Sequence, residues 1–126
     1  MATWDDVRRI AMALPEVSER DGPQWRVRDK LFLWARPLRP RDLDELGDGA
    51  PPGPILGARV PDEGAKRALV ADDGDVYFTT SHFDGYPAVL VQLDHISVDE
   101  LQELAVEAWL ARAPKRLAQQ FVAEQP

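Results

Sequence analysis

Apolar positions recur along the chain with two different periods, and each period predicts a different kind of element. Near the start, an apolar residue returns every three or four positions, which predicts a helix over residues 4–13. The same spacing follows the capping residue Ser97 and predicts the best-defined helix, over residues 98–111. Pro114 then opens a last short helix.

Between these helices the period falls to two, or the apolar run becomes continuous, as expected for strands. The predicted strands are residues 25–28, 31–35, 55–60, 76–80 and 88–93. Asp29 and Lys30 form the predicted turn of the first hairpin. A long Pro-rich surface loop is predicted over residues 37–54, with room for one helical turn over residues 42–46, and a short helix is predicted over residues 61–70. The pattern predicts an α+β fold, with an antiparallel sheet of about five strands and helices packed on one face.

Composition is typical of a soluble globular protein. The chain has 126 residues, of which 44% are hydrophobic and 29% charged, so we expect one domain over residues 1–126. No apolar run approaches the roughly 20 residues that cross a bilayer, and no secretory signal is evident. We therefore expect a cytoplasmic protein, monomeric by default, with no membrane partner. The absence of cysteine excludes disulfides, thiolate metal sites and cysteine nucleophiles.

The positive charge is concentrated in one segment. The formal net charge of −7 argues against a nucleic-acid partner, but residues 26–41 contain six basic side chains and one acidic side chain. The candidates for phosphate contact are Arg26, Arg28, Lys30, Arg36, Arg39 and Arg41, joined by Lys115 and Arg116 at the start of the last helix. Arg26 and Arg28 are predicted to share one strand face, with Lys30 at the tip of the hairpin. The alternative is a solvated charged face that balances the acidic remainder.

Aromatic residues supply two further candidates. Trp25 and Trp34 have the chemistry to stack on bases, although core packing is common at such spacings. The loop around His82, Phe83 and Tyr86, together with Trp25, is predicted to line a mostly apolar pocket for a small ligand or a protein partner.

Catalytic and metal sites are not predicted. Ser81, His82 and Asp84 are too close in an extended segment to pass a proton from one to the next. His82 and His95 are the only histidines, and their separation matches no compact ligand pattern. The acidic turn over residues 72–75 lacks the twelve-residue calcium loop. We expect no enzyme activity, metal site or cofactor.

Three stretches resemble the MmcQ/YjbR family: "RDKLFLWARPL", "VYFTTSHFDGYPAVLVQLD" and "DELQELAVEAWLARAPKRLAQQF". The resemblance implies a frataxin-like (CyaY-like) α+β fold and DNA binding of a double-wing type. Asp29 stands where the family usually has glycine before the lysine of the first hairpin, and the Pro-rich loop is longer than in compact members. By analogy of fold to frataxin, weak iron binding on the acidic remainder is a further alternative. DNA binding by the basic hairpin is the first hypothesis.

Overall fold

The computed structural model describes residues 1–125 as one six-stranded sheet with five α-helices and two short 3-10 helices. In chain order the elements are α1 (Trp4–Met12), β1 (Val17–Arg20), β2 (Gln24–Val27), β3 (Lys30–Ala35), α2 (Pro40–Leu46), η1 (Gly47–Gly49), β4 (Ile55–Arg59), α3 (Glu63–Asp72), β5 (Tyr77–Phe78), η2 (Ser81–Phe83), β6 (Ala88–Gln92), α4 (Val98–Arg112) and α5 (Lys115–Glu124). The predicted α+β class and the predicted helices are confirmed.

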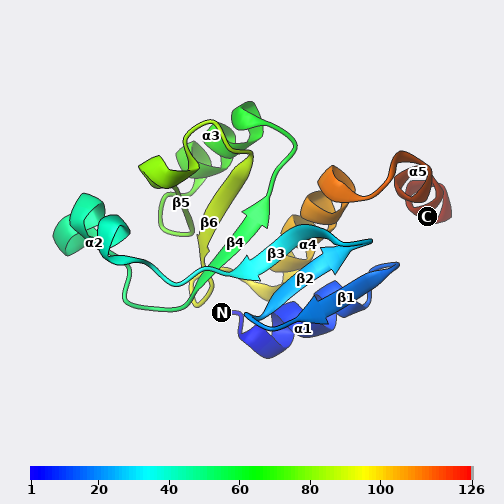
Figure 1. Ribbon diagram of the computed structural model, residues 1–126, viewed down its shortest axis with the longest axis horizontal. Coiled ribbons are helices and arrows are strands. Elements are labelled where there is room, and N and C mark those ends of the chain that lie inside the picture. Colours follow the sequence, from blue (N-terminus) through cyan, green and yellow to red (C-terminus); the bar gives the residue numbers. More distant parts are fainter. Residues whose placement is uncertain (126) are drawn as a thin grey trace.

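The sheet has the strand order β1-β2-β3-β4-β6-β5, and all neighbouring strands are antiparallel. Helices α1 and α4 lie behind the sheet in Figure 1, and side chains of α1, α3 and α4 join one hydrophobic core with the sheet. Strand β6 lies between β4 and β5, which explains why its sequence is almost entirely apolar. The opposite face of the sheet has no long helix across it (Figure 1).

The core between the sheet and the helices is centred on large aromatic side chains. Trp25 and Trp109 are both fully buried. Each satisfies its indole N–H, since Trp109 donates to the carbonyl of Pro15 at 3.0 Å and Trp25 donates to Glu19 at 2.9 Å. Buried polar atoms that keep a hydrogen bond avoid the desolvation penalty, so these two rings fix α4 and β2 in place.

Strand β1 was not predicted from the sequence. Its residues, Val17–Arg20, are mostly polar and exposed, so they show no apolar alternation. The strand forms because it pairs with β2 at the edge of the sheet. The sheet therefore has six strands.

The turn of the next hairpin lies one residue earlier than predicted. Arg28 and Asp29 form it, with φ values of 46° and 69°, and Lys30 already belongs to β3. These left-handed φ values match a two-residue hairpin turn. The prediction that Arg28 shares a strand face with Arg26 is wrong, because Arg28 lies in the turn.

Candidate functional site

The face of the sheet opposite the helices carries the candidate site, which we call the open face. Strand register places Trp34 beside Gly57, Gly57 beside Leu90 and Leu90 beside Phe78 across four neighbouring strands. Three of these side chains belong to a second, smaller hydrophobic cluster, separate from the main core. The open face thus has an apolar centre that is only partly covered.

Trp34 lies flat on the backbone of β4. A Cβ atom built on Gly57 would come within 2.4 Å of Cε2 and 2.6 Å of Cζ2 of the indole ring. Only glycine allows a ring to approach a strand this closely. One side of the Trp34 ring is therefore covered by the sheet, and the ring is partly exposed.

The loop that contains η2 forms one wall above the open face. Phe83 is buried in the second cluster, and His82 packs edge-on against it with ring centroids 4.9 Å apart. The Ser81 hydroxyl donates to Glu45 at 2.6 Å rather than to His82, so these residues form no catalytic triad. Tyr86 is partly exposed and its ring centroid lies 6.2 Å from that of Phe83.

A cavity of about 350 Å³ lies between this wall, β3 and the segment that follows β3. Its lining residues are Leu31, Trp34, Ala35, Arg36, Pro37, Arg39, His82, Phe83 and Tyr86. The structure thus brings together three of the four residues predicted to line a pocket. Trp25 is the exception: it is fully buried on the helix side of the sheet, and Trp34 occupies the open face instead.

Arg36 supports the cavity from inside the protein. Its guanidinium forms an ion pair with Asp42 at 3.0 Å, donates to the carbonyl of Pro37 at 2.5 Å and lies 5.2 Å from the centroid of the Phe83 ring. Both charged side chains of the pair are at least 95% buried. Arg36 was predicted to contact phosphate, but its guanidinium is already committed to these partners.

The pKa of Asp42 reflects the same contacts. Burial on its own would raise that pKa, but the backbone N–H of Arg39 and the Arg36 guanidinium outweigh burial and hold the pKa below its ordinary value. The Asp42 carboxylate accepts the Arg39 N–H at 2.9 Å, which also fixes the start of α2. Asp42 therefore remains ionised beside the cavity at neutral pH.

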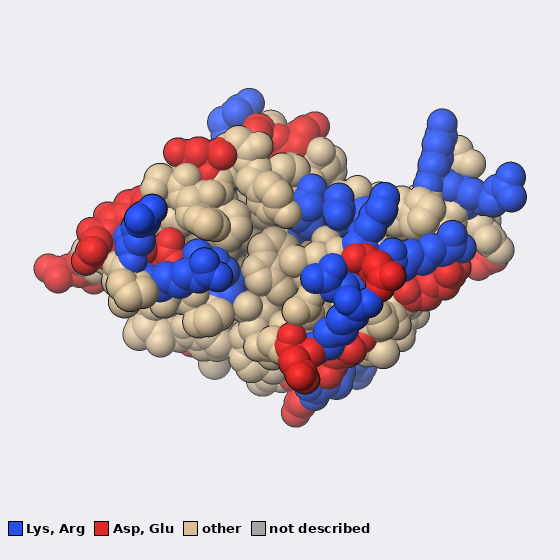
Figure 2. Space-filling view, viewed as in Figure 1, with Lys and Arg blue, Asp and Glu red and all other residues tan. Residues whose placement is uncertain are grey.

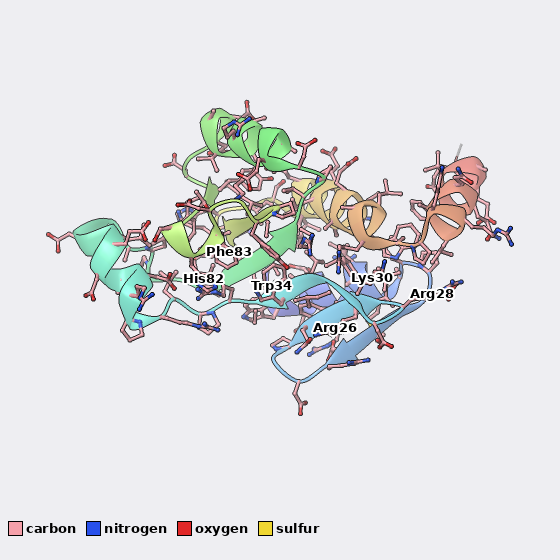
Figure 3. All side chains as sticks on the ribbon, turned by 45° about the horizontal axis from the view of Figure 1, so that its top comes forward. Arg26, Arg28, Lys30, Trp34, His82 and Phe83 are labelled. Carbon is pink, nitrogen blue, oxygen red and sulfur yellow. The ribbon has the colours of Figure 1, made fainter. Side chains whose placement is uncertain are left out.

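Arg28 is also paired. Its guanidinium donates to the two carboxylate oxygens of Glu16 at 2.6 and 2.9 Å, and these hydrogen bonds lower the pKa of Glu16. A bidentate arginine–carboxylate pair leaves few donors for a phosphate. Figure 3 shows Arg28 at the far end of the hairpin, away from Trp34.

Three other arginines lie near the start of β3: Arg26 on β2, Arg59 on β4, and Arg112 at the end of α4. Arg26 is the register partner of Leu31, and Arg112 of α4 donates to the Leu31 carbonyl at 3.2 Å. Arg59, at the end of β4, donates to the Tyr86 hydroxyl at 3.0 Å and lies 4.7 Å from the centroid of that ring. Burial lowers the pKa of Arg112, and the charge of Arg59 lowers it further.

Two of these arginines also donate to neutral acceptors: Arg26 to the Gln24 side chain at 2.7 Å and to the Asp29 carbonyl at 2.9 Å, and Arg59 to the Pro87 carbonyl at 3.1 Å. None of the three has an acidic counterpart that neutralises its charge. Within residues 1–125, no carboxylate forms an ion pair with Arg26, Arg59 or Arg112. Figure 3 shows Trp34 between Arg26 and the loop that carries His82 and Phe83. The open face therefore combines unpaired positive charge with an aromatic surface.

The remaining predicted basic residues are exposed and, among the described residues, also lack ion-pair partners. They are Lys30, Arg39, Arg41, Lys115 and Arg116. Arg39 lines the cavity, and the other four lie farther out on the hairpin, on α2 and on α5. In Figure 2, an uncharged strip on this side of the molecule lies between two groups of basic side chains.

A second cleft, of about 620 Å³, lies between α3 and α4, and Arg59 at the end of β4 also lines it. Tyr77 lines this cleft, and its hydroxyl donates to Glu100 at 2.5 Å. Burial raises the pKa of the Tyr77 hydroxyl well above its ordinary value, and the Glu100 carboxylate raises it further. Although several carboxylates lie along this cleft, no group of three histidine or acidic side chains in residues 1–125 is arranged to hold a metal ion. The iron hypothesis stays a prediction. None of the helices described is long and apolar enough to cross a membrane.

Comparison with known proteins shows the family. The family model described as YjbR matches residues 12–111, a range that includes all six strands. The chain belongs to the YjbR family. The predicted resemblance is confirmed.

Individual relatives show how far the similarity extends. Uncharacterized proteins of Mycobacterium bovis and Mycobacterium tuberculosis are each 56% identical to this chain, over 98% of both chains. A solved Deinococcus radiodurans protein with a DUF419 domain has a TM-score of 0.61 at 19% identity, covering 87% of this chain and 78% of its own. That structural similarity supports the fold alone.

Proposed function

We propose that this YjbR protein binds nucleic acid through its open face. The observation that carries the proposal is the group of unpaired arginines, Arg26, Arg59 and Arg112, beside Trp34 in a chain whose net charge is −7. Like charges repel and raise the energy of the folded chain unless an anion neutralises them. A phosphate backbone supplies such anions at regular spacing.

The contact surface differs from the one expected from the sequence. Arg28 and Arg36 are paired with carboxylates of the same chain, so the phosphate contacts of this proposal come from Arg26, Arg59 and Arg112. Lys30 and Arg39 extend the surface on either side, and Arg41, Lys115 and Arg116 form its periphery. The proposal contains no catalytic step, because the open face carries guanidinium groups and aromatic rings rather than a nucleophile with its base.

Salt dependence gives the first test. If the three arginines each neutralise one phosphate, log Kobs for a single strand should fall with log salt with a slope of about −2 or steeper. Raising salt from about 50 to 200 mM should then weaken binding roughly 20-fold. The measurement is fluorescence anisotropy of labelled single strands and duplexes titrated with the protein at several salt concentrations. Flat anisotropy with both probes at low salt would contradict the proposal.

The cavity favours a second candidate function, the binding of a small aromatic anion. Its apolar walls and few polar groups are typical of a small-ligand site, and Arg39 lies on its rim. In that case, a nucleoside monophosphate or an aromatic carboxylate would raise the melting temperature saturably, whereas oligonucleotides would show no salt-dependent binding.

A further inference from the structure

We propose that the open face takes single-stranded nucleic acid, with one unpaired base stacked on Trp34 inside the cavity. This inference rests on the proposed function and specifies its substrate class. Phosphate contact alone does not distinguish a duplex from a single strand. The geometry of Trp34 does, because stacking requires a base whose own face is free.

Trp34 has the position of a stacking platform. The backbone at Gly57 covers one side of its ring, and the ring also lines the cavity beside Phe83. A ring that is supported on one side and borders a cavity can accept a planar base without rearrangement of the sheet.

The indole N–H of Trp34 points to the same use. Trp25 and Trp109 donate their indole N–H groups to Glu19 and to the Pro15 carbonyl. Trp34 makes no such hydrogen bond within residues 1–125, although its ring packs against the second cluster. This donor therefore has no partner among the described residues.

Charge complementarity identifies the occupant as a nucleotide strand rather than an uncharged aromatic molecule. Leu31 and Trp34 both line the cavity. Arg26 is the register partner of Leu31, and Arg112 donates to the Leu31 carbonyl. Arg59 is held against Tyr86, which lines the same cavity. A base on Trp34 would therefore leave its neighbouring phosphates within the reach of these arginines. In a duplex, both faces of each internal base are already stacked, so the cavity would stay empty.

The test compares four labelled probes of equal length by fluorescence anisotropy at one low salt concentration. They are a single-stranded DNA, the same sequence as RNA, the DNA duplex, and a single-stranded DNA with abasic sites that keeps every phosphate. Base stacking on an aromatic side chain contributes a factor of roughly 5 to 150 in affinity. We expect the intact single strands to bind more tightly than the abasic strand by that factor, with the same salt slope. A difference in affinity between the DNA and RNA single strands would show which sugar the site prefers.

Variants of the protein give an independent readout. Trp34→Leu should weaken binding of the intact strand by the same factor and leave the abasic strand unaffected, whereas Trp34→Phe should retain most of the affinity. Trp4→Leu is the matched control, because Trp4 is also a half-buried tryptophan but packs against Trp25 in the main core.

The two levels of the proposal fail in different ways. If the duplex and the abasic strand bind as tightly as the intact strand, and Trp34→Leu has no effect, base stacking is wrong and phosphate binding stands. If none of the four probes binds, nucleic-acid binding itself is wrong. The abasic strand decides the question even if Trp34→Leu fails to fold.

Discussion

Replacing Asp42 with alanine is expected to lower the free energy of unfolding by about 3–5 kcal/mol. Asp42 and Arg36 form an ion pair of 3.0 Å whose side chains are only 4% and 5% exposed. Removing the carboxylate leaves the Arg36 guanidinium buried without its counter-charge, and it also removes the acceptor for the Arg39 N–H. Urea denaturation followed by tryptophan fluorescence measures the loss.

Asp44→Ala is the matched control for this prediction. Asp44 lies in the same helix, α2, but is exposed, so its replacement should change the free energy of unfolding by less than about 0.5 kcal/mol. A loss below about 1 kcal/mol for Asp42→Ala would show that the buried pair does not hold this wall of the cavity.

The same pair sets a pH dependence with a definite sign. The pKa of Asp42 is lower in the folded protein than its ordinary value of 3.8. Its contribution to stability is therefore complete above that value and is lost as the pH falls through the lower folded pKa. The difference in stability between the wild type and Asp42→Asn should accordingly shrink as the pH drops below about 4.

Removing two of the open-face charges should have the second large effect. The double variant Arg26→Gln, Arg59→Gln is expected to bind single-stranded nucleic acid about 25-fold more weakly at 0.1 M salt, because each lost phosphate contact removes about 0.7 from the magnitude of the salt slope. The slope itself should become less steep by about 1.4. Anisotropy titrations at several salt concentrations measure both quantities.

A charge-matched control separates local contacts from net charge. Arg9→Gln, Arg67→Gln also removes two positive charges, but from exposed positions on α1 and α3. It should leave the affinity within about twofold of the wild type and the slope unchanged, since charges beyond a Debye length of about 10 Å are screened. Equal losses in both variants would mean that binding depends on overall charge and not on the open face.

The sequence predicted the helices because their signals are local. Thr3 caps α1 by accepting from Asp6, and Ser97 caps α4 by accepting from the Glu100 N–H. Each cap lies within three residues of its partner, so the spacing is visible in the chain. The edge strand β1 escaped prediction because its stability comes from pairing with β2, which no local pattern records.

A register shift between β2 and β3 determines the face of the sheet on which each tryptophan lies. The shift falls between Trp25 and Arg26, so that Trp25 pairs with Leu33 and Arg26 with Leu31. Phe32, the extra residue, and Leu33 both belong to the main core, and Trp34 returns to the open face. Strict alternation from Leu31 onward cannot anticipate such a bulge.

The arginine group was missed for a related reason. Arg59 and Arg112 lie far from the basic segment in sequence, at the ends of β4 and α4. They come near β3 only because β4 pairs with β3 and α4 packs against it. The available signal for Arg59 was alternation along β4: Leu56 and Ala58 are buried in the main core, and Gly57 and Arg59 alternate with them. Alternate residues of a strand share a face. Composition likewise does not predict that Arg28 and Arg36 form ion pairs with Glu16 and Asp42.

Nuclear magnetic resonance titration of the ¹⁵N-labelled protein with a single-stranded oligonucleotide tests the central claim most directly. Binding to the open face should shift the indole N–H signal of Trp34 and the backbone amides of β2, β3 and β4 near Arg26 and Arg59. The amides of α3 and the side of α4 that faces it should stay in place. Shifts confined to the α3–α4 cleft, or no saturable shift at low salt, would contradict the assignment of the open face as a nucleic-acid interface.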